Sequence, residues 1–124
     1  MSKNILIVDD SEMTRRLIST AIRRLEDIEY EEAKDGFEAI QKLPTNAFDM
    51  LFVDINMPNI NGLELIDYCK QSEQYRQIPI VIISTEDSRR DQEKGLELGA
   101  SAYLLKPIQL DQLLDVIKTT LGRA

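Results

Sequence analysis

Three short apolar runs, rich in β-branched residues, constrain the fold of this chain more than any other feature. They lie at residues 5–8, 50–53 and 80–83, and they lack the alternation of polar and apolar side chains seen in a half-exposed strand. Such runs are typical of parallel strands buried on both faces. The more polar segments 30–33 and 102–105 predict two further strands, placed at the edges of the sheet.

The segments between these runs carry apolar residues at helical spacing. The first segment is the clearest, because its arginines fall outside an apolar face made of Met13, Leu17, Ile18, Ala21, Ile22 and Leu25. The outer arginines are Arg15, Arg16, Arg23 and Arg24. Shorter stripes predict three more helices through Phe37, Ile40 and Leu43, through Leu63, Leu65, Ile66 and Cys69, and through Leu110, Leu113, Leu114, Ile117 and Leu121.

The segment 87–98 is the most polar of the predicted helices, and we expect it to be the most exposed one. Strands that alternate with helices in this way indicate right-handed β-α-β units. The sequence therefore predicts an α/β fold in which a parallel sheet is covered by helices on both faces.

Length and composition limit what the chain can be. With 124 residues we expect one domain, 1–124, and no separate output domain. One cysteine and no histidine exclude a Cys/His zinc site and histidine-based triads. The net charge of -7 argues against direct nucleic-acid binding. No apolar run is long enough for membrane insertion and the start does not read as a signal peptide, so we expect a cytoplasmic protein.

Polar residues follow the predicted strands where each of them ends. In an open α/β sheet, ligands bind beyond the carboxyl ends of the strands, so these residues are expected to share one rim. The candidates are Asp9, Asp10, Asp54, Ser84, Thr85 and Lys106.

The three carboxylates predict a cation site, because converging negative charges repel one another unless a cation neutralises them. Oxygen ligands favour Mg2+, or Mn2+, over a softer metal. Lys106 adds positive charge, and a helix that begins after Asp10 with Ser11 as its N-cap adds its dipole. Asp54 is then placed to act as a nucleophile that accepts a phosphoryl group.

Each residue also has an ordinary structural interpretation. Single aspartates at strand ends commonly cap turns, Ser84 and Thr85 could simply end a strand, and Pro107 could begin the last helix. Cys69 on an apolar stripe is expected in the core. The group Glu29, Glu31 and Glu32 is expected to be a solvated edge rather than a second metal site.

Several motifs together resemble the receiver domain of two-component response regulators, over nearly the whole chain. They are Val8-Asp9-Asp10-Ser11, Val53-Asp54-Ile55-Asn56-Met57-Pro58, Gly62, Ser84 and Leu105-Lys106-Pro107. Asn56-Met57-Pro58-Asn59 and Ser101-Ala102-Tyr103 are similar to single-domain chemotaxis members of that family. The resemblance implies a flavodoxin-like (βα)5 fold, doubly wound, with five parallel strands in the order 2-1-3-4-5.

The resemblance also implies roles for individual residues. Asp54 would be the phosphoacceptor, and Lys106 would hold the phosphoryl group. The Mg2+ ligands would be Asp10, Asp54 and the backbone carbonyl of Asn56, with Asp9 acting through water. Ser84 would be the switch hydroxyl and Tyr103 the aromatic residue that follows it. The phosphodonor would be a sensor histidine kinase, and the chain would not otherwise be an enzyme.

A downstream protein is the second partner that the resemblance implies, with chemotaxis-like signalling or a place in a phosphorelay as the output. It would bind residues presented by the segments 87–98, 102–105 and 110–121, namely Arg89, Arg90, Lys94, Tyr103 and Gln109. Two further positions are expected to modulate the site: Glu86, and Thr85, which stands where the family usually has alanine or glycine.

Three other kinds of protein remain as alternatives. A haloacid-dehalogenase-like Mg2+ phosphatase needs a second aspartate two residues after the nucleophile, and Asn56 stands there. A flavodoxin-like electron carrier would have to place a flavin phosphate beside Asp9 and Asp10, which would repel it. A receiver-like scaffold that binds partners without phosphorylation is disfavoured, because all of the catalytic positions are filled.

Overall fold

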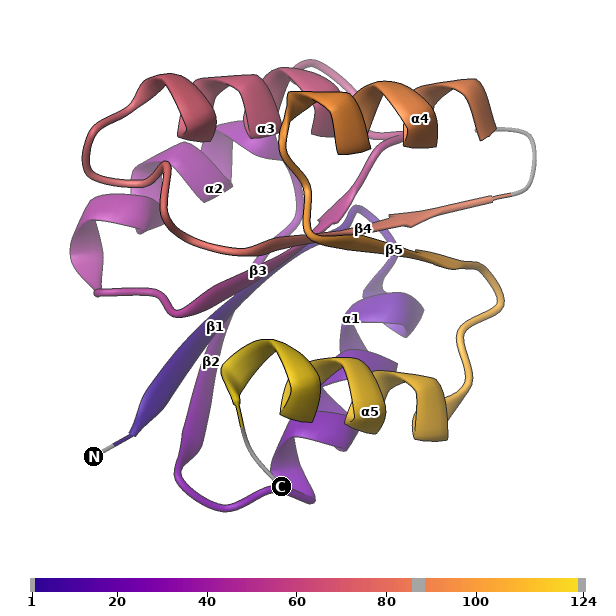
Figure 1. Cartoon of the computed structure of the whole chain (residues 1–124). Helices are drawn as coiled ribbons and strands as arrows, with labels where there is room; N and C mark the ends of the chain where they lie inside the picture. Colours follow the sequence, from indigo (N-terminus) through magenta and orange to yellow (C-terminus); the bar gives the residue numbers. More distant parts are fainter. Residues whose placement is uncertain (1, 86–88, 123–124) are drawn as a thin grey trace.

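A computed structural model describes residues 2–85 and 89–122, and its centre is a five-stranded parallel sheet (Figure 1). Its strands are β1 (Lys3–Val8), β2 (Ile28–Ala33), β3 (Met50–Asp54), β4 (Ile80–Ser84) and β5 (Ala102–Leu105). They lie in the order β2-β1-β3-β4-β5, and all four neighbouring pairs are parallel. The expected α/β fold and its strand order are therefore confirmed.

Helices cover both faces of the sheet. The helices are α1 (Glu12–Arg23), α2 (Gly36–Lys42), the short 3-10 turn η1 (Leu43–Thr45), α3 (Gly62–Gln71), α4 (Arg89–Leu98) and α5 (Leu110–Leu121). Figure 1 shows α2, α3 and α4 on one face, with α1 and α5 on the other. This two-sided cover is what makes a continuously apolar strand stable.

The three apolar runs form the buried centre of the sheet, as expected. Every residue of β3 and β4 is buried, and so are the last four residues of β1. Successive side chains point to opposite faces, so that Leu6 and Val8 pack under α2 and α3 while Ile5 and Ile7 pack against α1 and α5. Each such side chain contributes roughly 1.5–3 kcal/mol of hydrophobic free energy.

The two edge strands alternate between exposed and partly buried positions, which explains why their sequences are more polar. On β2, Glu29 and Glu31 are exposed and Tyr30 is partly buried. On β5, Tyr103 and Leu105 are exposed, while Ala102 and Leu104 face inward. The interpretation of 30–33 and 102–105 as edge strands is confirmed.

Helix α1 begins as expected, because the side chain of Ser11 accepts a hydrogen bond from the backbone N–H of Thr14 at 3.3 Å. The expectation that Met13 lies in the buried stripe is wrong, since Met13 is 82% exposed. Met13 instead lines an open apolar cavity of about 560 Å³, together with Pro107 and Ile108 from the loop after β5.

Two other helix predictions need correction. Phe37 is exposed because α2 buries Gly36 and Ala39 instead, and Gly36 lies so close to Ile60 that a Cβ there would be 2.6 Å from the Ile60 Cβ. Pro107 does not begin the last helix. Helix α5 starts at Leu110, where the side chain of Gln112 accepts a hydrogen bond from the backbone N–H of Gln109 at 3.1 Å.

The remaining helices agree with the sequence pattern. Among the described residues of α4 only Gln92 and Gly95 are buried, which fits an exposed helix; positions 87 and 88 lie outside the described residues. Cys69 is buried in the core as expected, and burial raises the pKa of its thiol to about 11. Within the described ranges, no helix is both long enough and apolar enough to cross a membrane.

Candidate functional site

The carboxyl ends of the central strands bring three aspartates together. Asp9 and Asp10 follow β1, and Asp54 is the last residue of β3, the strand beside it. One carboxylate oxygen from each of the three lies within 4.8 Å of the others. Asp9 is 0% exposed and Asp54 is 2% exposed, whereas Asp10 is open to solvent. The structure thus places two buried carboxylates and one exposed carboxylate in a single crevice.

Backbone N–H groups hold the two buried carboxylates in place. Ser11 N–H donates to Oδ1 of Asp9 at 2.8 Å, and Asn56 N–H donates to Oδ1 of Asp54 at 3.2 Å. Gly62 lets the start of α3 approach this loop, because a Cβ there would lie 2.4 Å from the carbonyl oxygen of Asp54. One oxygen of each carboxylate is therefore fixed by a backbone N–H.

Lys106, the first residue after β5, reaches the second oxygen of each of these two carboxylates. Its Nζ lies 3.2 Å from Oδ2 of Asp9 and 3.5 Å from Oδ2 of Asp54. Oδ2 of Asp9 is buried, and it accepts no hydrogen bond of ordinary geometry from any described residue. A single ammonium group therefore neutralises two buried carboxylates only in part.

The pKa values of these groups follow from their burial and from the charges beside them. Burial, reinforced by the charge of Asp9, raises the pKa of Asp54 from 3.8 to about 7, although Lys106 and the Asn56 N–H oppose the shift. Burial also raises the pKa of Asp9. Burial by itself would lower the pKa of Lys106, but the two carboxylates outweigh it and the pKa is raised.

These residues fit a hard divalent cation. The donors are carboxylate oxygens, which Mg2+ and Mn2+ prefer, and the unsatisfied Oδ2 of Asp9 is an oxygen that gains from a second positive charge. A cation bound here would offset the burial and the mutual repulsion that raise the pKa of both buried aspartates. The cluster formed by Asp9, Asp10 and Asp54 is the one that could hold a metal among the described residues.

Ser84, at the end of β4, is buried and its hydroxyl donates to the carbonyl oxygen of Thr85 at 3.3 Å. The side chain of Thr85 is exposed beside it, and Glu86 lies outside the described residues. Gln92 on α4 is 4% exposed, and its amide donates to the Ser84 hydroxyl at 2.5 Å and to the Thr85 carbonyl at 3.3 Å.

Gln92 is not among the site residues predicted from the sequence. A signal for it exists, because Gln92 and Gly95 are the uncharged positions within residues 89–95, and both of them are buried. The uncharged positions therefore indicate which face of this polar helix packs against the sheet.

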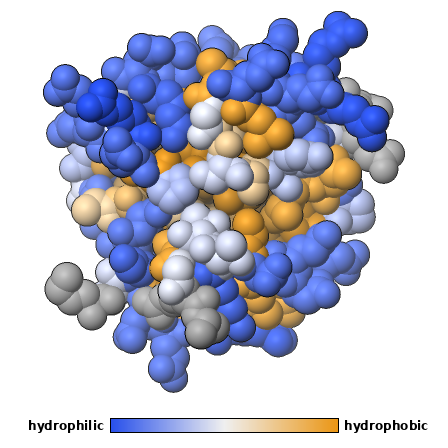
Figure 2. All heavy atoms as spheres, viewed as in Figure 1, coloured by the Kyte–Doolittle hydropathy of each residue, from blue (hydrophilic) through white to orange (hydrophobic). Residues whose placement is uncertain are grey.

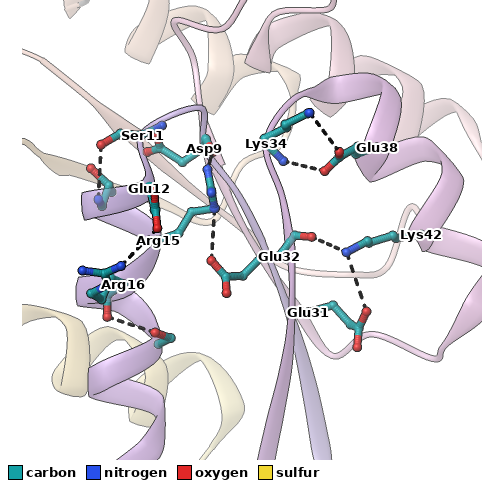
Figure 3. A network of polar contacts seen from close by, with 12 residues as sticks. Asp9, Ser11, Glu12, Arg15, Arg16, Glu31, Glu32, Lys34, Glu38 and Lys42 are labelled. Atoms are coloured by element: carbon teal, nitrogen blue, oxygen red, sulfur yellow. Dashed lines mark hydrogen bonds and ion pairs between the residues drawn. The ribbon is translucent and has the colours of Figure 1, made fainter.

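Arg15 was also missed, since the sequence analysis placed it outside the apolar face of its helix. Its side chain is only 16% exposed, because Nη1 donates to the backbone carbonyl of Asp9 at 2.7 Å and Nε donates to Glu32 at 3.0 Å. Figure 3 shows Arg15 lying between Asp9 and Glu32, with Lys42 contacting Glu32 and Glu31 from α2. This network ties the backbone at Asp9 to β2.

The surface made by α4, β5 and α5 carries the residues expected to meet a partner, and all five of them are exposed: Arg89, Arg90, Lys94, Tyr103 and Gln109. A small groove of about 250 Å³ runs between α4 and β5. It is lined by Arg89, Gln92, Glu93, Leu96 and Tyr103. Figure 2 shows apolar side chains exposed among charged ones on this side of the molecule, and Leu96, Tyr103 and Leu105 are among the large exposed side chains of the chain.

The fold and the site combine a five-stranded parallel sheet with three aspartates and a lysine at one rim. Comparison with known sequences shows which family of proteins has this combination. Residues 5–118 match the response regulator receiver domain, and the chain belongs to that family. The match favours a receiver over the electron carrier and the phosphatase considered from the sequence.

Individual relatives agree with the family assignment. The chain is 35% identical to chemotaxis protein CheY1 of Helicobacter pylori over 119 residues, which cover 95% of this chain and 96% of that protein. It is 30% identical to the polar-differentiation response regulator DivK of Brucella ovis over 124 residues, which cover both chains completely. The solved structure of chemotaxis protein CheY4 of Vibrio cholerae superposes with a TM-score of 0.88 at 32% identity, covering 98% of this chain and 100% of that one.

Proposed function

We propose that this receiver domain accepts a phosphoryl group on the carboxylate of Asp54, in a reaction that needs Mg2+. The observation that carries the proposal is the convergence of Asp9, Asp10, Asp54 and Lys106 in one crevice, where the ammonium group of Lys106 lies against one oxygen of each buried carboxylate. Transfer to a carboxylate depends mainly on position and on neutralisation of charge. The burial of Asp54 fixes the position of the acceptor, and Lys106 supplies part of the charge neutralisation.

In the proposed reaction, Oδ2 of Asp54 attacks the phosphorus of a phosphohistidine on a sensor histidine kinase. An oxygen–phosphorus bond forms, the nitrogen–phosphorus bond breaks, and the imidazole leaves with the electron pair. The ammonium group of Lys106 then holds a phosphoryl oxygen. Hydrolysis of the acyl phosphate by water restores the carboxylate and ends the signal.

Asp10, Asp54 and the backbone carbonyl of Asn56 would hold the cation directly, and Asp9 would hold it through water. When bound, Mg2+, or Mn2+ in its place, supplies positive charge that offsets both the carboxylates and the phosphoryl oxygens. Asp9 contributes by keeping a buried negative charge beside the acceptor, and the N–H of Ser11 keeps its carboxylate oriented.

The proposed output is a change on the surface of α4, β5 and α5. Ser84 would turn its hydroxyl toward the phosphoryl group, Tyr103 would follow, and a downstream protein would bind the altered surface. Thr85 and Glu86 would modulate the lifetime of the phosphoryl group. The chain would thus be a signalling switch rather than an enzyme that acts on other molecules.

Two pathways are compatible with the relatives. One relative is named as a chemotaxis protein, which supports a chemotaxis-like output. Another is named as a polar-differentiation response regulator, so an output other than chemotaxis, such as a place in a phosphorelay, is the alternative. We favour a stand-alone regulator of the chemotaxis kind, working in the cytoplasm with a histidine kinase and one downstream protein.

The test is incubation with acetyl phosphate and Mg2+, followed by measurement of the intact mass. The wild-type chain is expected to gain one phosphoryl group, and Asp54→Ala is expected to gain none. Asp115→Ala, which removes an exposed carboxylate on α5, is the matched control and should behave as wild type. Equal gain by the Asp54 variant, or no gain by the wild type, would defeat the proposal.

A further inference from the structure

Gln92 is a buried polar side chain on a helix that is otherwise polar and exposed. Burial of a primary amide is unfavourable unless its N–H groups find acceptors. Gln92 Nε2 finds two of them, the hydroxyl of Ser84 and the carbonyl of Thr85, both at the end of β4. These two hydrogen bonds join α4 to the strand that ends beside the acceptor site.

The hydroxyl of Ser84 has one proton to donate, and that proton is directed to the carbonyl oxygen of Thr85 at 3.3 Å. In the arrangement described here Ser84 therefore donates to its own backbone and accepts from Gln92. Under the proposed function, Ser84 must instead donate to a phosphoryl oxygen on Asp54. In the proposed function this side chain turns toward the phosphoryl group, and a turn that carries the oxygen away from α4 takes a buried acceptor from Gln92.

Gln92 also lines the groove between α4 and β5, together with Tyr103 and Leu96. The side chain of Gln92 therefore contacts Ser84 and also lines the groove that faces the solvent. One turn later, Gly95 packs directly on β4, and a Cβ there would lie 2.2 Å from Cδ1 of Ile82. The helix cannot slide closer to the sheet at Gly95, so a change at Gln92 has to move the start of α4 or reorient its side chains.

We propose that Gln92 is a positioning residue that holds the hydroxyl of Ser84 in the unphosphorylated arrangement, and that its release couples phosphorylation of Asp54 to the groove between α4 and β5. This inference rests on the proposed function and deepens it. Gln92 stabilises the resting form and gives up its bond to Ser84 in the active one.

The test variant is Gln92→Met, which keeps the length of the side chain and removes both N–H donors. Loss of a net hydrogen bond from the resting form should raise the ratio of active to resting molecules about fivefold in the absence of phosphate. Proton–nitrogen correlation NMR spectra of the wild type, with and without acetyl phosphate and Mg2+, give the two reference positions. The backbone signals of Ser84 and Tyr103 in unphosphorylated Gln92→Met should lie on the line between them, displaced toward the phosphorylated position.

A merely structural role would displace these signals in unrelated directions, so the alignment of the shifts is informative. Glu93→Gln is the matched control, because Glu93 lines the same groove but is exposed. Its signals should stay at the resting position. In the background of Ser84→Ala, which removes the acceptor hydroxyl, Gln92→Met should produce no further displacement along the line. Gln92→Leu is a second variant that removes the same donors, in case Gln92→Met does not fold.

The outcomes separate this inference from the proposed function. If the wild type gains a phosphoryl group while the Gln92 variants keep the resting spectrum, the role of Gln92 is overturned and the proposed function stands. The role is also overturned if the displacement persists in Ser84→Ala. A wild type that gains no phosphoryl group overturns both.

Discussion

Replacing Asp54 with asparagine should make the metal-free protein more stable at neutral and alkaline pH. The pKa of Asp54 is raised from 3.8 to about 7, so between these values the folded chain binds a proton that the unfolded chain has lost. Protonated Asp54 makes a favourable contribution to the free energy of folding. This contribution is complete below pH 3.8 and is lost as the pH rises through 7. Above that window, wild-type Asp54 carries a buried charge that weakens folding.

The size of the effect follows from the pKa change. A difference of about 3 pH units at 1.36 kcal/mol per unit sets a ceiling near 4 kcal/mol. Asparagine keeps an oxygen for the Asn56 N–H but gives up the attraction to Lys106, so we expect a net gain of about 2 kcal/mol near pH 8. At about pH 4 wild-type Asp54 is largely protonated, and the gain should fall below roughly 1 kcal/mol.

The measurement is urea unfolding followed by far-UV circular dichroism, with a chelator present, at several pH values across this range. Asp115→Asn, an exposed aspartate on α5, is the control and should change the free energy of unfolding by less than about 0.5 kcal/mol at every pH. Adding Mg2+ should stabilise the wild type and have a much smaller effect on Asp54→Asn. The reasoning is refuted if wild type and variant are equally stable near pH 8, or if their difference does not depend on pH.

Three further predictions concern neighbours of Asp54. Lys106→Ala should destabilise the metal-free chain by about 2–4 kcal/mol near neutral pH, because two buried carboxylates lose their counter-charge, and adding Asp54→Asn should restore much of the loss in urea unfolding. Arg15→Met should weaken Mg2+ binding about tenfold in calorimetry, since the backbone at Asp9 loses its support; unchanged affinity would contradict this role. Thr85→Ala should speed phosphorylation by acetyl phosphate and subsequent dephosphorylation about threefold, and unchanged rates in a mass-based time course would show that Thr85 does not limit access.

The centre of the sheet and the rim could be predicted from the sequence because both depend on short-range patterns. A strand buried on both faces needs an unbroken apolar run, as at Ile80–Ser84 before its final serine, and the residue that follows such a run must lie at the carboxyl edge. The order of the strands could not be predicted in this way, because an apolar run does not indicate which strand lies beside it. That order came from the resemblance to a family.

The residues that were missed or misplaced depend on tertiary neighbours. Helical periodicity puts Met13 on the apolar face of α1, but in the fold this side chain lines an open cavity beside the loop after β5 and stays exposed. Arg15 and Gln92 have long polar side chains whose targets, the carbonyl of Asp9 and the hydroxyl of Ser84, lie on other elements. No local pattern encodes the direction in which such a side chain turns.

The position of Lys106 has a consequence for how the crevice takes up a cation. Because its ammonium group already lies against both buried carboxylates, Lys106 is a tethered competitor present at a high effective concentration. A divalent ion would have to displace this competitor as well as shed water, and its affinity would be the difference between the two associations. Cation exchange at the crevice should therefore be rapid and reversible, and the displaced ammonium group becomes free to meet the next anion that arrives.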